Sequence, residues 1–147
     1  MPPEEEIPSS YLMKHKLVRP INRVGQKRCA TILSMKTIST PISRKELTNI
    51  AAQKFGNLVK AVVDINKKIM VIDADLHSDE EAELLHTGSK QENLWGINLY
   101  PELTGEDFIE FDSMINVRPS ANNKSRSVES EHIRKQIVDI VLSLIAL

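Results

Sequence analysis

The sequence predicts an α+β fold with a mostly antiparallel sheet, built from hairpins, and with helices packed on one face. Two pairs of apolar runs are each joined by a short polar or glycine-containing connection, which is typical of β-hairpins. Three further stretches carry apolar residues at spacings of three and four, which is typical of amphipathic helices. The predicted order is β-α-β-β-α-β-β-α, without the long crossovers that join parallel strands.

The first predicted elements are a short strand and a helix. Residues 35–40 form the strand candidate, and a proline follows. Ser43 and Glu46 have the spacing of a capping box, in which each side chain satisfies a backbone donor at the helix start. Apolar residues then recur at helical spacing until Gly56. The sequence therefore predicts a helix over residues 44–55.

The next elements are a hairpin and a second helix. Residues 58–65 and 69–74 are rich in Val and Ile and are joined by a short polar turn, so they predict two antiparallel strands in the middle of the sheet. Ser78 is the predicted N-cap of the second helix, which ends at Gly88. The last helix is predicted over residues 131–146, after the Ser130 cap.

The hairpin predicted over residues 94–118 has one apolar and one polar face, because side chains alternate across a strand. The apolar face is expected to hold Trp95, Ile97 and Leu99 from the first run and Ile109, Phe111, Ile115 and Val117 from the second. The polar face is the candidate binding face and comprises Asn98, Tyr100, Glu110, Asp112, Asn116 and Arg118. Gly96, inside the first run, indicates a bulge or a close approach by a ligand or another element.

Length and composition predict one soluble domain. The chain has 147 residues, which suits a single domain, and no apolar run approaches the roughly 20 residues that span a bilayer. Cys29 is the only cysteine, so a disulfide or a Cys-based zinc site within one chain is excluded. The first residues lack the apolar segment of a secretory signal. We therefore expect a cytoplasmic protein that does not bind membranes.

Charge divides the chain into a basic N-terminal extension, residues 1–34, and an acidic domain, residues 35–147. The extension has a net charge of +3 and the rest a net charge of −4. Prolines interrupt the extension and it lacks a sustained hydrophobic period, so it is predicted to be disordered. The alternatives are a basic arm that touches nucleic acid or an acidic partner, and a biological start at Met35. For the domain, the charge argues against nucleic acid.

A resemblance supports the domain boundary. The string LHSDEEAELLHTGSKQENLWGINLYPE, followed by FIEFDSMINVRPS and an amphipathic helix, resembles a family of small bacterial and archaeal proteins known as domain of unknown function 5674. The resemblance covers about residues 35–146 and implies a single domain that starts near Met35. It implies no catalytic residue.

A divalent metal is the candidate cofactor. His77 and Glu81 are four residues apart near a helix start, and Glu110 and Asp112 point the same way from one strand. Carboxylates and imidazole are metal ligands, and neighbouring carboxylates can also share a proton. The alternative is ordinary helix capping and a solvated sheet face.

A polar loop with two cations, residues 122–126, is a further candidate for receiving a phosphate group. The alternative is a loop that is merely solvated.

Two functions remain on the sequence alone. The first is a non-catalytic interaction module, either a homodimer or a protein that binds another protein, because no catalytic motif is present. The second is a metal-assisted hydrolase of a phosphate-containing substrate. It would use Glu110 and Asp112 as ligands, with Asp64, His77 and Glu81 as further candidates and Arg118 on the phosphate.

Overall fold

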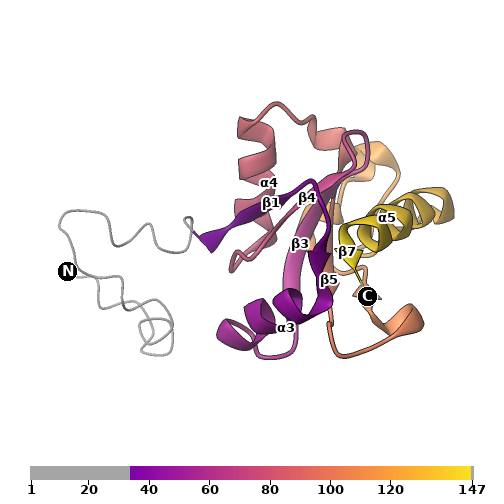
Figure 1. Cartoon of the computed structure of the whole chain (residues 1–147). Coiled ribbons are helices and arrows are strands. Elements are labelled where there is room, and N and C mark those ends of the chain that lie inside the picture. The colour runs from indigo at the N-terminus through magenta and orange to yellow at the C-terminus, as the bar shows by residue number, and fades with distance from the viewer. Residues whose placement is uncertain (1–33, 147) are drawn as a thin grey trace, which may run out of the picture. The chain divides into compact units, whose positions relative to one another are not determined.

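The computed structural model describes residues 34–146 (Figure 1). Within this range five strands form one antiparallel sheet in the order β1-β4-β3-β5-β6. The strands are β1 (Lys36–Ile38), β3 (Val59–Asp64), β4 (Ile69–Ile72), β5 (Leu94–Leu99) and β6 (Ile109–Glu110). The helices are α3 (Arg44–Gln53), α4 (His77–His86) and α5 (Glu131–Leu144). The α+β class is confirmed, and the predicted element order holds apart from two additional two-residue strands, Ile42–Ser43 and Ile145–Ala146. The domain boundary stays a prediction, and the expectations for residues 1–33 lie outside the described residues.

The capping residue predicted for α3 is confirmed, although only half of the capping box forms. The Ser43 hydroxyl accepts a hydrogen bond from the backbone N–H of Glu46 at 3.0 Å. The Glu46 carboxylate does not return to the cap, because it pairs with the Lys36 ammonium of β1 at 3.0 Å. This ion pair joins the edge strand to the first turn of the helix.

The centre of the sheet is the predicted hairpin of β3 and β4, flanked by β5. Val62 of β3 pairs with Val71 of β4 on one side and with Gly96 of β5 on the other. The Asp64 carboxylate holds the turn, because one oxygen accepts from the N–H groups of Asn66 and Lys67 at 2.8 and 2.9 Å. β3 is therefore the strand around which the sheet is built.

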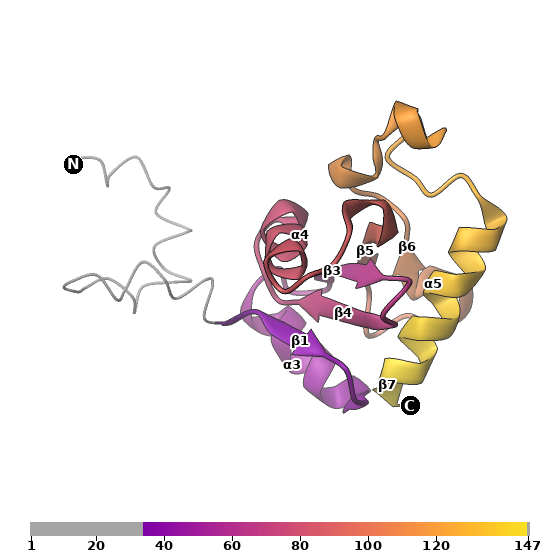
Figure 2. The same cartoon turned by 90° about the horizontal axis from the view of Figure 1, so that it is seen from above.

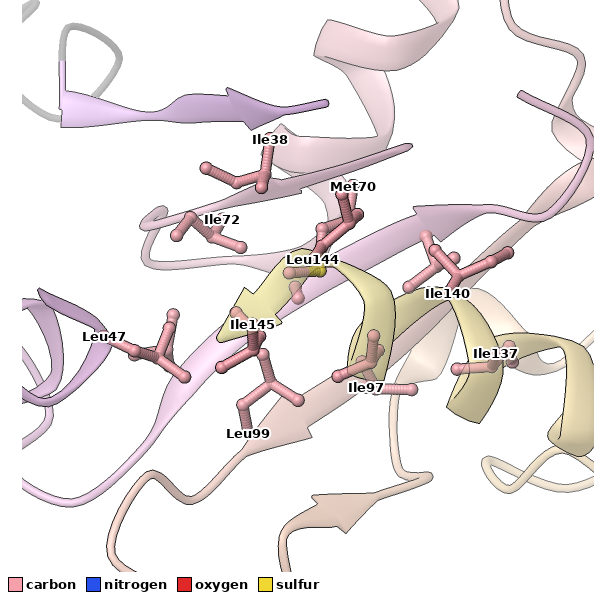
Figure 3. Close-up of a cluster of buried hydrophobic side chains, with 14 of the residues drawn as sticks. Ile38, Leu47, Met70, Ile72, Ile97, Leu99, Ile137, Ile140, Leu144 and Ile145 are labelled. Carbon is pink, nitrogen blue, oxygen red and sulfur yellow. The ribbon is translucent and has the colours of Figure 1, made fainter. Parts of the chain in front are cut away.

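The larger hydrophobic core lies between the sheet and helices α3 and α5. Figure 3 shows Ile137, Ile140 and Leu144 of α5 turned toward sheet residues that include Ile97 and Leu99. Leu47 enters the same core from α3. The stripe predicted along the last helix and the apolar face predicted for Trp95, Ile97 and Leu99 are both confirmed by this core.

The expectation that all helices pack on one face is wrong for α4. Leu84 of α4 is fully buried against Val62, Val71 and Leu94, whose side chains point away from the larger core. Figures 1 and 2 show α4 and α5 on opposite sides of the sheet. β3 is covered on both faces, because Val59, Ala61 and Val63 are buried in the larger core and Val62 is buried in the smaller one.

The start of α4 also differs from the prediction. The helix begins at His77 with Leu76 as its N-cap, and no side chain caps it. Ser78 is therefore inside the helix. Glu80, one turn in, accepts a hydrogen bond at 3.0 Å from the backbone N–H of Ala74, in the segment that leads to the helix. This inward carboxyl ties the preceding loop to α4 in place of a cap.

The second strand of the predicted 94–118 hairpin is much shorter than expected. Only Ile109 and Glu110 belong to β6, and the chain then forms the 3₁₀ turn η5 (Met114–Asn116). Ile115 consequently packs against the smaller core beside α4, on the opposite face from Ile109 and Phe111. The alternation of apolar and polar residues after Glu110 does not reflect a strand.

Residues 145–146 leave the predicted last helix. They form β7 (Ile145–Ala146), which pairs in parallel with β2 (Ile42–Ser43) immediately before α3. This two-stranded pair joins the end of α5 to the start of α3. Among the described residues, no helix has the length and apolar character needed to cross a membrane.

Candidate functional site

Four of the six residues predicted for the polar hairpin face come together around Asn98. The Asn98 side-chain amide donates to the Glu110 carboxylate at 2.9 Å and to the Asp112 carbonyl at 3.4 Å. The Tyr100 hydroxyl donates to the same Glu110 oxygen at 2.9 Å. The Asp112 carboxylate accepts from Arg126 at 2.6 Å. We call Asn98, Tyr100, Glu110 and Asp112 the Asn98 cluster.

The Asn98 cluster is a network of hydrogen bonds at the edge of the sheet. Asn98 is 7% exposed, and its amide oxygen has no hydrogen-bond partner among the described residues. Burial and the hydrogen bond to Glu110 raise the pKa of Tyr100, so its hydroxyl remains a neutral donor at physiological pH. The arrangement can therefore accept hydrogen bonds at the buried Asn98 oxygen and at the two carboxylates, whereas the Tyr100 proton is already donated to Glu110.

His77 lies beside this cluster as the first residue of α4. Its Nε2 is 2.8 Å from the Ile97 carbonyl, and because a carbonyl only accepts, Nε2 must carry a proton. Burial lowers the His77 pKa to about 4, and the hydrogen bond to Ile97 opposes this only in part. His77 is therefore neutral at physiological pH and fixes α4 to β5.

Asn116 is placed differently from the prediction. It is buried, and its side-chain oxygen accepts from the N–H of Gly96 at 2.8 Å while its side-chain nitrogen donates to the Gly96 carbonyl at 3.0 Å. The amide thus continues the hydrogen-bond ladder of β5 after β6 has ended. A Cβ at Gly96 would lie 2.6 Å from the Ser113 side chain, so the close approach expected at this glycine is made by another element of the fold.

Arg118 is also absent from the polar face. Its guanidinium donates to the backbone carbonyls of Gln91 and Leu94 and stacks over the Trp95 ring, 4.2 Å from the ring centroid. Burial lowers the Arg118 pKa. These contacts occupy the side chain inside the fold, so the phosphate clamp expected for Arg118 has no support here.

The candidate metal ligands do not meet. Glu81 accepts from Gln91 at 3.2 Å, whereas Glu110 belongs to the Asn98 cluster. Asp64 is used in the β3–β4 turn and in a 2.5 Å hydrogen bond from Ser89. Within residues 34–146, no three His, Cys, Asp or Glu side chains are grouped so that they could hold a metal ion. The geometry gives the hydrolase hypothesis no support.

The loop expected to receive a phosphate is filled by its own residues. The Glu129 carboxylate accepts from the backbone N–H groups of Lys124 and Ser125 at 3.0 and 2.9 Å. Hydrogen bonds from Ser125 are the main cause of a lowered Glu129 pKa. Asn123, buried beneath, donates to three carbonyls of the loop and its approach. An internal carboxylate thus occupies the position predicted for an external anion.

An open groove lies beside α5, away from the Asn98 cluster. It has a volume of about 1040 Å³ and lies between α5 and the loop that joins β5 to β6. We call it the α5 groove. Its apolar lining comes from β6, the loop and the outer side of α5, and comprises Pro101, Phe108, Ile109, Phe111, Val138 and Leu142.

Charged side chains surround this apolar lining. Arg44 stacks over Phe108 at 4.2 Å and donates to the Pro101 carbonyl at 2.6 Å, so it fixes the loop wall. Arg134 lies 5.0 Å from the Phe111 ring centroid and donates to the Val128 carbonyl. The remaining charged lining residues are Glu102, Glu106, Lys135 and Asp139.

The α5 groove was not predicted from the sequence. Val138 and Leu142 are four residues apart, so they share a side of the helix next to the predicted core stripe. That second stripe is the signal that points to the groove. Leu142 is 52% exposed, and Leu103 on the loop is 45% exposed. Large apolar groups left in water beside a concavity are typical of a binding surface.

The comparisons with known proteins give a family and no named relative. Over residues 36–144 the sequence matches the profile of a family described as Protein of unknown function (DUF5674). No curated protein and no solved structure matches the chain. The match covers nearly all of the described fold, from β1 to the end of α5, and confirms the resemblance carried by the strings around β5. The chain therefore belongs to the DUF5674 family of proteins of unknown function.

Proposed function

We propose that the protein is a non-catalytic interaction module and that the α5 groove receives apolar side chains of a polypeptide partner. The observation that carries the proposal is an open groove of about 1040 Å³ with an apolar lining and a half-exposed leucine, Leu142, on its wall. Binding surfaces of this kind combine an apolar centre with a polar rim.

The groove is held in a fixed shape before any partner arrives. Arg44 joins α3 to the loop wall through the Pro101 and Leu103 carbonyls. Arg134 fixes the start of α5 to the preceding loop through the Val128 carbonyl and the Ser127 hydroxyl. A preformed surface loses little conformational entropy on binding, which favours affinity.

The polar residues of the sheet fit a structural role better than a catalytic one. His77 is neutral, and its proton-bearing nitrogen is committed to the Ile97 carbonyl. Glu110 accepts from both Asn98 and Tyr100. We infer that the Asn98 cluster shapes the sheet edge and offers secondary polar contacts.

With a single cysteine in the chain, we also propose a reducing compartment, the cytoplasm, as the location of the protein.

The proposal is tested with Nile red, a neutral dye that fluoresces in apolar surroundings. At submicromolar protein, we expect the wild type to enhance dye fluorescence and Leu142→Glu to abolish the enhancement. Leu85→Glu is the matched control, because Leu85 is a 40%-exposed helical leucine on α4 and does not line the groove. Equal enhancement by the wild type and both variants would refute the groove as the binding surface.

A further inference from the structure

We propose that the partner received by the α5 groove is a second copy of this chain, related to the first by a two-fold axis. This inference rests on the proposed function, because it names the occupant of the same groove. In a two-fold interface each copy presents the same surface, so any contact from the loop of one copy to α5 of the other occurs twice. The surface must therefore be complementary to itself.

The charges of the α5 groove have that property. The loop wall carries two acids, Glu102 and Glu106, whereas the start of the α5 wall carries two adjacent cations, Arg134 and Lys135. When two copies face each other across the two-fold axis, the acidic wall of each lies against the basic wall of the other. Opposite potentials on facing surfaces favour association and fix its register.

The acids are free to make these contacts. Among residues 34–146, Glu102 and Glu106 have neither an ion-pair nor a hydrogen-bond partner. Lys135 pairs with Asp139 at 3.0 Å, but both side chains are largely exposed. An exposed pair four residues apart on a helix contributes little and is readily exchanged. Lys135 can therefore turn to an incoming carboxylate.

The apolar groups are also divided between the two walls. Leu142 is half-exposed on α5, and Leu103 is exposed on the loop that forms the opposite wall. The two-fold dimer removes both leucines of each copy from water. The net charge of the whole chain is −1, so two copies repel each other only weakly.

A polypeptide of one charge sign fits this surface less well than a second copy. A basic segment would pair with Glu102 and Glu106 but would meet Arg134 and Lys135 on the other wall. An acidic segment would have the reverse problem. Only an occupant that carries both signs in the matching order pairs with both walls, and a second copy does so by symmetry.

The first test is the concentration dependence of the mass of the full chain in solution, measured by analytical ultracentrifugation. We expect the wild type and Leu85→Glu to dimerise reversibly. Leu142→Glu should raise the dimer dissociation constant by at least about tenfold, the effect of losing one well-placed contact. Circular dichroism melting shows that each variant is folded.

The second test is an exchange of charges. One variant carries Glu102→Lys and Glu106→Lys, and the other carries Lys135→Glu; Arg134 is left unchanged because it holds the Val128 carbonyl. Alone, the double variant has only cations at the facing positions of both walls, and Lys135→Glu leaves Arg134 as the one cation opposite Glu102 and Glu106, so the dissociation constant of each homodimer should rise by at least about tenfold. Mixed together they restore the wild-type charges at one contact and place the carboxylate introduced at position 135 against the introduced ammonium groups at the other, so the heterodimer should form more tightly than either homodimer.

Three outcomes separate this inference from the proposed function. A monomeric wild type that enhances Nile red fluorescence through Leu142 overturns the second copy as partner and leaves the groove as a binding surface. A dimer that is unaffected by Leu142→Glu and by the charge exchange places the interface elsewhere and also overturns the inference. A monomer whose dye fluorescence does not depend on Leu142 overturns both.

Discussion

The side-chain amide of Asn116 forms two hydrogen bonds with the backbone of Gly96: its oxygen accepts from the Gly96 N–H and its nitrogen donates to the Gly96 carbonyl. The amide thus pairs with the backbone of β5 as a residue of a neighbouring strand would. The chain can therefore leave the sheet after β6 while the buried N–H and carbonyl of Gly96 keep hydrogen-bond partners; leaving them unpaired would cost free energy of folding. A side chain far along the sequence terminates the sheet edge at this point.

Replacing Asn116 by alanine should destabilise the protein by about 2–4 kcal/mol, because two buried backbone groups of Gly96 lose their partners. The single tryptophan, Trp95, lies next to this site and is buried, so its fluorescence reports urea unfolding. Asn57→Ala is the control, because Asn57 is exposed, and its change should stay within about 0.5 kcal/mol. Equal losses in the two variants would contradict the role given to Asn116.

Gly96→Ala should destabilise the protein by about 1–3 kcal/mol through overpacking, because the new methyl group would lie 2.6 Å from Ser113. Combining it with Ser113→Gly removes the atoms in the clash. The double variant should therefore lose less free energy of unfolding than the two single variants added together, by at least about 0.5 kcal/mol. Strict additivity would show that Ser113 does not set the constraint.

The lowered pKa of His77 leads us to expect a loss of stability in acid. Its pKa in the folded protein is about 4, below the ordinary value of 6.5, because of burial. As the pH falls below 6.5, the His77 imidazole is protonated in the unfolded chain but stays neutral in the folded protein. The free energy of unfolding therefore decreases until the pH reaches about 4. The expected loss is about 1–3 kcal/mol. His77→Gln keeps a donor for the Ile97 carbonyl without titrating, so its unfolding free energy should fall less between pH 7 and pH 4.5.

The raised pKa of Glu80 leads us to expect the opposite dependence of stability on pH. It is fully buried, and burial raises its pKa well above the usual 4.5, although the Ala74 N–H and Lys60 oppose this. Below pH 4.5 Glu80 is protonated in both the folded and the unfolded protein, and its contribution to stability is then at its maximum. This contribution is lost as the pH rises through the pKa of the folded protein. Glu80→Gln should therefore gain stability relative to the wild type at pH 8 and much less at pH 5. Glu83→Gln, which removes a carboxyl from the same helix, is the matched control.

Local signals in the sequence were sufficient for most of the elements. The Ser43 cap and the following apolar spacing predicted α3, and the Val-rich runs around a polar turn predicted the β3–β4 hairpin. Both features act within a few residues, so a single sequence contains them. The same holds for Trp95, Ile97 and Leu99, whose alternation matches their burial in the larger core.

The site was only partly predictable, because its organisation depends on contacts between distant residues. Asn98, Tyr100, Glu110 and Asp112 converge as expected, since β5 and β6 pair at Asn98 and Glu110. Asn116 and Arg118 do not, because carbonyl and amide groups of the segment 91–96 bind their side chains. The alternation of apolar and polar residues after Glu110 could not reveal this, although Asn116 is a poor strand former.

The unequal covering of the sheet has a consequence for local opening. Within residues 34–146, the apolar cluster on the α4 side has four buried residues, whereas α3 and α5 share a much larger core on the other side. Detaching α4 therefore exposes little apolar surface compared with detaching α5. In amide hydrogen exchange under native conditions, the backbone of α4 should therefore open at a lower free energy than the backbone of β3. In that opening the side-chain contact between Leu84 and Val62 is lost while the core on the α5 side stays intact.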